Sequence, residues 1–122
     1  MFVLKIVTDF SSAHSLRNYS GDCSRLHGHN WDVEVSVCSE VLNDLGIAID
    51  FREIKNQTKS VAKRLDHQYL NEISPFDVLN PTAENIAKYI FDEVELLINT
   101  KDVKVKEVTI WETARSAVTY SL

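Results

Sequence analysis

The spacing of apolar residues marks two extended segments in the first forty residues. Residues 2–10 and residues 31–39 both alternate: Phe2, Leu4, Ile6 and Phe10 lie on one side of the first segment, and Lys5 and Asp9 lie on the other. In the second segment the apolar positions are Trp31, Val33, Val35 and Val37. A period of two places alternate side chains on opposite faces of an extended chain. We therefore predict two strands, each with one buried face.

Helical spacing replaces this alternation in the middle of the chain. The apolar residues Phe51, Ile54, Val61, Ala62 and Leu65 recur at helical spacing, and Asp50 and Glu53 are placed as a capping box. A second stripe follows the helix-start signal Asn80-Pro81-Thr82. It consists of Ile86, Ile90, Val94, Leu97 and Ile98. We predict two amphipathic helices, joined by an irregular stretch.

Alternation returns in the C-terminal part, from Val103 to Trp111. The apolar parity shifts between Val105 and Val108, which indicates a β-bulge near Lys106 and Glu107. A last strand from about residue 117 to residue 122 completes a hairpin. The order strand, strand, helix, helix, strand, strand predicts an α+β fold, a four-stranded antiparallel sheet with both helices on one face. Its two open edges favour oligomerisation.

Composition and charge limit the number of domains and the classes of partner that the chain can have. A chain of 122 residues, 44% hydrophobic and 25% charged, is typical of one globular domain spanning residues 1–122. A formal charge of −5 argues against nucleic-acid binding. No apolar run approaches the roughly 20 residues of a membrane span, and the N-terminus does not read as a signal peptide. We expect a cytoplasmic protein in which Cys23 and Cys38 are free thiols.

Histidines provide the main chemical signal, since three of the four lie between positions 14 and 29. In His27-Gly28-His29 an extended backbone directs both imidazoles to the same face. His14, at the end of the first strand, supplies a third nitrogen. Three imidazoles with a free fourth position describe a catalytic zinc site. The alternative for any one of them is a packed core histidine.

Four further positions carry residues that could take part in catalysis or ligand binding, close to this cluster or at the ends of predicted helices and strands. Cys23 is either a fourth zinc ligand or a thiolate base or nucleophile, and the sequence leaves both open. Asp66-His67 follows the first helix as an oriented base or as a simple turn. Glu112 shares the inward parity of the preceding apolar run, so its carboxylate either meets a ligand's N–H donors or lies at a surface turn. Glu84 most simply favours the N-terminus of the second helix.

Five motifs, taken together, resemble the 6-pyruvoyl-tetrahydropterin synthase family. They are Phe10-Ser11-Ser12-Ala13-His14, Cys23-Ser24-Arg25-Leu26-His27-Gly28-His29-Asn30, Leu65-Asp66-His67, Asn80-Pro81-Thr82-Ala83-Glu84-Asn85 and Trp111-Glu112-Thr113. The resemblance spans nearly the whole chain. The short spacer between Cys23 and His27 is similar to that of the bacterial 6-carboxy-5,6,7,8-tetrahydropterin synthase branch, in the queuosine (7-deazapurine) pathway.

The resemblance implies the tunnelling fold (T-fold), trimers that form a twelve-stranded barrel, stacking into a homohexamer, and active sites between subunits. It implies Zn²⁺ held by His14, His27 and His29, and Cys23 as the proton-transferring thiolate. It implies that Asp66 and His67 complete the proton relay of Cys23. It also implies that Glu112 anchors the pterin and that Glu84 lies beside it. The implied lyase converts 7,8-dihydroneopterin triphosphate to 6-carboxytetrahydropterin, acetaldehyde and triphosphate.

Two other functions stay open at this point. The sister activity, 6-pyruvoyltetrahydropterin synthesis, uses the same substrate and much the same residues. A non-catalytic zinc-binding oligomeric module is the alternative from another class, although the intact catalytic set argues against it. The triphosphate contacts are also open, because no glycine-rich phosphate loop is present and only Lys5, Arg17, Arg25 or a partner subunit offers cations.

Overall fold

Two long antiparallel strands organise the molecule. The computed structural model describes all of residues 1–122. β1 (Phe2–His14) and β2 (His27–Ser39) pair along their whole length, with Phe2 opposite Ser39 and His14 opposite His27. Both strands extend four residues further toward the histidines than the alternating pattern predicts, because the polar residues there interrupt the apolar alternation without interrupting the ladder.

The sheet has five strands in the order β3-β1-β2-β4-β5. β4 (Lys104–Thr113) and β5 (Ser116–Ser121) form the predicted C-terminal hairpin. The prediction of a purely antiparallel four-stranded sheet is wrong in one respect, because β3 (Gln68–Tyr69) pairs in parallel with the end of β1. A strand of two residues is too short to produce a periodic pattern. The α+β class is confirmed.

The predicted bulge in β4 is confirmed. Across the β2–β4 ladder, Ser36 lies opposite Glu107 and Val37 lies opposite Val105. Lys106 is therefore the extra residue, as the parity shift between Val105 and Val108 indicates.

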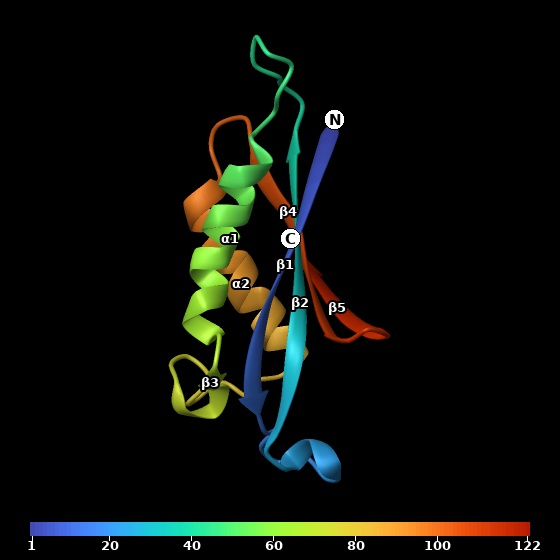
Figure 1. The fold of residues 1–122 in the computed structure, drawn as a ribbon, viewed down its shortest axis with the longest axis vertical. Helices are drawn as coiled ribbons and strands as arrows, with labels where there is room; N and C mark the ends of the chain where they lie inside the picture. The colour runs from blue at the N-terminus through green and yellow to red at the C-terminus, as the bar shows by residue number, and fades with distance from the viewer.

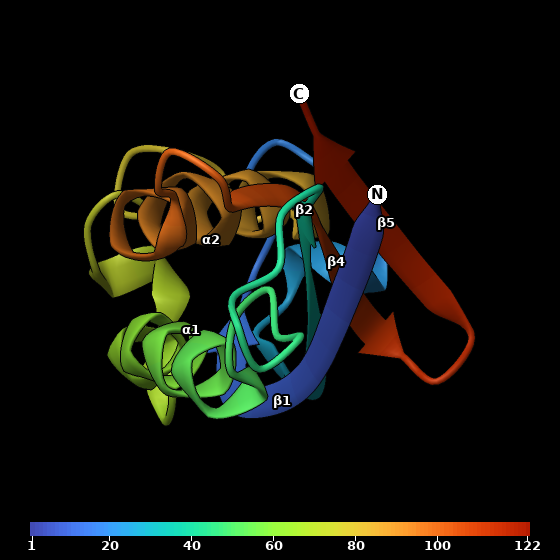
Figure 2. The same cartoon turned by 90° about the horizontal axis from the view of Figure 1, so that it is seen from above.

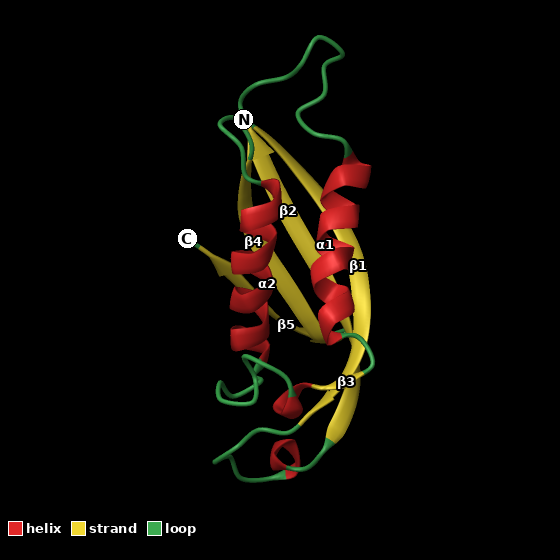
Figure 3. Ribbon diagram, turned by 90° about the vertical axis from the view of Figure 1, so that its left-hand side faces the viewer, coloured by secondary structure: helices red, strands yellow, loops and turns green.

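Both helices cover one face of the sheet, and the other face is left bare (Figures 1 and 2). α1 (Phe51–Leu65) and α2 (Ala83–Ile98) run beside each other across the strands (Figure 3). The side chains of Asp50 and Thr82 cap their N-termini. Asp50 accepts from the backbone N–H of Arg52, so the cap is present although the reciprocal Glu53 bond of a capping box is not.

The core fills the space between the helices and the sheet. Its largest fully buried side chain is Trp31, which stacks on Phe10 with ring centroids 6.0 Å apart. The same face of β1 and β2 carries His14, His27 and His29 beyond these rings. The core thus ends where the histidines begin. Neither helix is both long enough and apolar enough to cross a membrane.

Replacing the cap of α2 is expected to weaken the fold. In Thr82→Ala the backbone N–H of Asn85 loses its 3.1 Å acceptor, which should lower the free energy of unfolding by about 1 kcal/mol in urea titrations. Ser60→Ala is the matched control, because it removes an exposed hydroxyl from inside α1. An equal loss in both variants would contradict the capping role.

Candidate metal centre and active site

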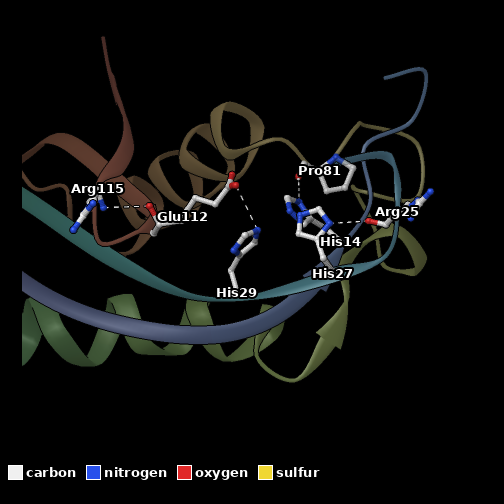
Figure 4. A network of polar contacts seen from close by, with 8 residues as sticks. His14, Arg25, His27, His29, Pro81, Glu112 and Arg115 are labelled. Carbon is white, nitrogen blue, oxygen red and sulfur yellow. Dashed lines mark hydrogen bonds and ion pairs between the residues drawn. The ribbon is translucent and has the colours of Figure 1, made fainter. Parts of the chain in front are cut away.

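Three histidine rings converge at the end of the β1–β2 ladder (Figure 4). Centroid distances are 4.5 Å for His14–His27, 4.8 Å for His27–His29 and 5.2 Å for His14–His29. One nitrogen from each ring lies within 4.8 Å of the other two. Nitrogens that share a tetrahedral zinc at about 2.0–2.1 Å lie roughly 3.3 Å apart, so small ring rotations would close this cluster on an ion.

Backbone carbonyls fix the orientation of two of the rings. His14 Nδ1 donates to the carbonyl oxygen of Pro81 at 2.7 Å, and His27 Nδ1 donates to that of Arg25 at 2.7 Å. A carbonyl only accepts, so in each neutral ring the proton is on Nδ1 and the lone pair is on Nε2. This is the arrangement in which a metal-binding imidazole is anchored through its other nitrogen.

Burial keeps the cluster in the form that binds cations. It lowers the pKa of His14 from its ordinary value of 6.5, and the neighbouring His27 and His29 lower it further, against the opposing effect of the Pro81 bond. Burial likewise lowers the pKa of His29, against the opposing charge of Glu112. Neutral imidazoles are metal ligands, whereas protonated ones are not. The lowered pKa values of His14 and His29 therefore favour the neutral, metal-binding form of these two rings at physiological pH.

Unpartnered buried nitrogens provide an independent indication of a cation site. Nε2 of His14 and Nε2 of His29 are buried and have no hydrogen-bond partner. Such orphaned groups are costly unless a ligand satisfies them. Three imidazole nitrogens fit a divalent metal with an open coordination position, and no cysteine or carboxylate belongs to the group. These residues can hold one metal ion.

Glu112 reaches the cluster from β4. Its Oε1 lies 3.4 Å from His29 Nε2, close enough for electrostatic contact, although no hydrogen bond joins the two atoms. In the β4–β5 ladder, Trp111 pairs with Ala117 and Thr113 pairs with Ser116, so Glu112 is left out as a bulge. A bulge redirects a side chain. Of the two sequence interpretations, the structure supports the inward carboxylate, two-thirds buried beside the histidines.

Asp66 and His67 form a bonded pair just past α1. Asp66 Oδ1 accepts from the backbone N–H of Ser11 at 2.8 Å, and Oδ2 lies 2.9 Å from His67 Nδ1. The Ser11 bond and then the His67 bond lower the pKa of Asp66, so this carboxylate stays ionised. His67 adopts a left-handed backbone, with φ 57°, and most of its ring is exposed. The pair is thus both the turn and the oriented imidazole that the sequence suggested.

Two other candidates lie apart from the cluster within this chain. Cys23 lies in a short 3₁₀ helix, Asp22–Ser24, in the connection between β1 and β2, where its carbonyl accepts from Leu16. It makes no hydrogen bond with Asp66 or His67. Glu84 is exposed on the first turn of α2, as expected for a side chain that favours a helix N-terminus.

An open cavity of about 500 Å³ is lined by one histidine of the cluster, His29, and by His67. Its lining also includes Ser11, Asn30 and Tyr69. Sequence reasoning missed these three polar residues, and also the carbonyls of Pro81 and Arg25 that anchor the rings. No pattern in the sequence marks a backbone carbonyl as a ring anchor, since every residue has one.

Comparison with known proteins identifies the family. Residues 4–122 match the family profile described as 6-pyruvoyl tetrahydropterin synthase. The chain belongs to this family. Membership confirms the expectation of an enzyme, because the tetrahydropterin synthases of the family are lyases.

Individual relatives agree with this assignment. A putative 6-carboxy-5,6,7,8-tetrahydropterin synthase from Archaeoglobus fulgidus is 37% identical over 106 residues, which cover 86% of this chain and 87% of that protein. The 6-carboxy-5,6,7,8-tetrahydropterin synthase of Synechocystis is 33% identical over 125 residues, covering 98% and 93%.

Solved structures confirm the tunnelling fold. The Caenorhabditis elegans 6-pyruvoyl tetrahydropterin synthase superposes with a TM-score of 0.89 at 28% identity, covering 99% of this chain and 95% of that one.

Removing one ring of the cluster is expected to remove the metal. His27→Ala leaves two nitrogens, so purified protein should contain far less metal per chain than the wild type, as measured by atomic spectrometry. His67→Ala is the control, since its ring is outside the cluster and it should retain the metal. Metal content that is unchanged in His27→Ala would exclude the three-histidine site.

Proposed function

We propose that the chain is a zinc-dependent 6-carboxy-5,6,7,8-tetrahydropterin synthase. The reaction converts 7,8-dihydroneopterin triphosphate, with uptake of water, to 6-carboxytetrahydropterin, acetaldehyde and triphosphate, a step of queuosine (7-deazapurine) biosynthesis. The observation that carries this proposal is the cluster of three converging histidines, two of them anchored by backbone carbonyls, in a chain of this family. The names of relatives such as those from Synechocystis and Archaeoglobus support the carboxy product.

His14, His27 and His29 would hold the zinc. Bound there, zinc supplies Lewis-acid polarisation of a substrate oxygen, which makes a proton on the neighbouring carbon easier to remove. An all-nitrogen set of three ligands is typical of catalytic rather than structural zinc. The tightly packed Trp31 ring, 5.0 Å from both His14 and His29, excludes water from the inner side of the cluster.

Glu112 is proposed to orient the pterin. A carboxylate accepts two parallel N–H donors, and the aminopyrimidine edge of a pterin presents such a pair. The bulge that directs Glu112 toward His29 supports this role, because it places the acceptor beside the proposed zinc ligands. Glu84 is proposed as an auxiliary pterin contact, on its motif position alone.

Cys23, Asp66 and His67 are proposed to move the proton. Asp66 holds the Nδ1–H of His67, which leaves Nε2 to accept the thiol proton, and the ionised carboxylate stabilises the resulting imidazolium. The resulting thiolate is the base that takes the proton from the substrate carbon.

Subunit pairing would bring these groups together, because Cys23 does not contact the pair within one chain. β5 is an open edge of the sheet, and β3 covers only Ser12 and Ala13 on the outer side of β1. Two free edges on one sheet favour head-to-tail closure into a ring. We therefore propose a homohexamer formed by two stacked trimers, in the cytoplasm.

The sister activity is the second candidate. The similarity to the Caenorhabditis elegans 6-pyruvoyl tetrahydropterin synthase favours it, and both activities require the same substrate chemistry. A non-catalytic metal-binding module is disfavoured, because Cys23, the Asp66–His67 pair and Glu112 are all retained.

Product mass distinguishes the two activities. Incubation of the zinc-loaded protein with 7,8-dihydroneopterin triphosphate should release acetaldehyde and a pterin with the mass of the carboxy compound, measured by liquid chromatography and mass spectrometry. A pyruvoyl product without acetaldehyde would assign the sister activity. No turnover in zinc-loaded protein would support the non-catalytic module.

Loss of the Cys23 thiol should separate catalysis from metal binding. Cys23→Ala is expected to lower turnover about 10²- to 10⁴-fold, the usual contribution of a positioned acid or base, with zinc content unchanged. Cys38→Ala is the control thiol and should keep both properties. Zinc loss in Cys23→Ala would instead make Cys23 a ligand.

A further inference from the structure

Two asparagine side chains hold the segment that follows His14. Asn71 Oδ1 accepts from the backbone N–H of Ser15 at 2.9 Å, and its Nδ2 donates to the Ser15 carbonyl at 2.8 Å. Asn80 makes the same two bonds with Arg17: its Oδ1 accepts from the backbone N–H at 2.9 Å, and its Nδ2 donates to the backbone carbonyl at 3.2 Å. Each amide thus satisfies both main-chain groups of one residue, and the two residues are two positions apart. The asparagines replace the next strand of a ladder just where β1 ends.

The side chain of Arg17 bonds back to the segment that contains Asn71 and Asn80. We call the bonds that Asn71, Asn80 and Arg17 make across these two segments the interlock. Its guanidinium donates to the carbonyl oxygens of Phe76 at 2.6 Å, Asn71 at 3.3 Å and Leu79 at 3.4 Å. These bonds fold the connection between β3 and α2 over the end of β1. They give Arg17 a structural role in this connection.

The interlock controls both ends of the hydrogen bond that orients His14. Asn80 immediately precedes Pro81, whose carbonyl accepts from His14 Nδ1 at 2.7 Å. The backbone of His14 is continuous with Ser15, which Asn71 holds. The main-chain carbonyl of Asn80 accepts from Asn85 Nδ2 at 2.8 Å, which ties the acceptor to α2 as well. These bonds thus act on the backbone at both ends of the His14–Pro81 hydrogen bond.

We propose that Asn80, supported by Asn71 and Arg17, is a positioning residue that selects the Nδ1–H tautomer of His14. This tautomer directs the Nε2 lone pair into the cluster, where that atom is buried and unpartnered. The consequence for metal affinity rests on the proposed zinc site. The tautomer itself is a property of the metal-free chain. Groups that orient a ligand in this way typically change metal affinity about 10- to 100-fold when they are replaced.

Asn80→Leu tests the proposal, because leucine has a similar size and removes both bonds to Arg17. Asn99→Leu is the matched control: the Asn99 side chain also accepts from a backbone N–H, that of Val105 at 2.7 Å, but at the far end of α2. Long-range ¹H–¹⁵N spectra of the metal-free proteins report the His14 tautomer. Competition of Zn²⁺ with a chromophoric chelator reports affinity.

Wild type and Asn99→Leu should show protonated Nδ1 at His14 and equal zinc affinity. Asn80→Leu should show a substantial Nε2–H population and an affinity about 10-fold weaker or more. Retention of the Nδ1–H tautomer, with the affinity of the control, would overturn the proposal.

A second variant protects the test against a folding defect. Asn80→Asp keeps an acceptor for the Arg17 N–H but turns a carboxylate oxygen toward the Arg17 carbonyl, so a change of the same sign is expected. If it matches wild type in both readouts, the proposal fails. The tautomer is measured without metal or substrate, so an absence of pterin synthesis would count against the proposed function alone.

Discussion

The register between β1 and β2 is the constraint on which the rest of the structure depends. His14 lies opposite His27, and every pair behind it follows, to Phe2 opposite Ser39. Because side chains alternate along a strand, a slip of one residue would turn the histidines of one strand away from the helix-covered face. The same slip would expose apolar residues of that strand. The hydrophobic burial of Trp31 and Phe10 therefore also fixes the geometry of the three histidines, so that folding and assembly of the candidate site are one event.

The site is the end of the core, where the buried face changes from apolar to imidazole side chains. This position explains its chemistry. Burial keeps His14 and His29 neutral, and it leaves ring nitrogens without partners, each at a cost of about 1–3 kcal/mol. A cation offsets that cost, whereas water is excluded on the side of Trp31. The chain thus stores an unfavourable interaction in its folded state that binding relieves, which links metal affinity directly to fold stability.

Much of this arrangement could be predicted from the sequence, for identifiable reasons. The period of α1, the start signal of α2 and the parity shift at Lys106 are local patterns, and all three correspond to the structure. The convergence of His27 and His29 also follows from local spacing. β3 was missed because it has only two residues. The Asn71 and Asn80 contacts were missed because they join residues more than fifty positions apart through side-chain amides, for which local sequence carries no signal.

The position of Glu112 in the β4–β5 ladder makes the length of the hairpin a determinant of what the site recognises. The carboxylate reaches His29 because the ladder skips one residue between Trp111 and Thr113. Deletion of a single residue from this hairpin would restore regular pairing and exchange the acid for an indole or a hydroxyl. A change of chain length, without any replacement of a contacting side chain, would then alter ligand preference.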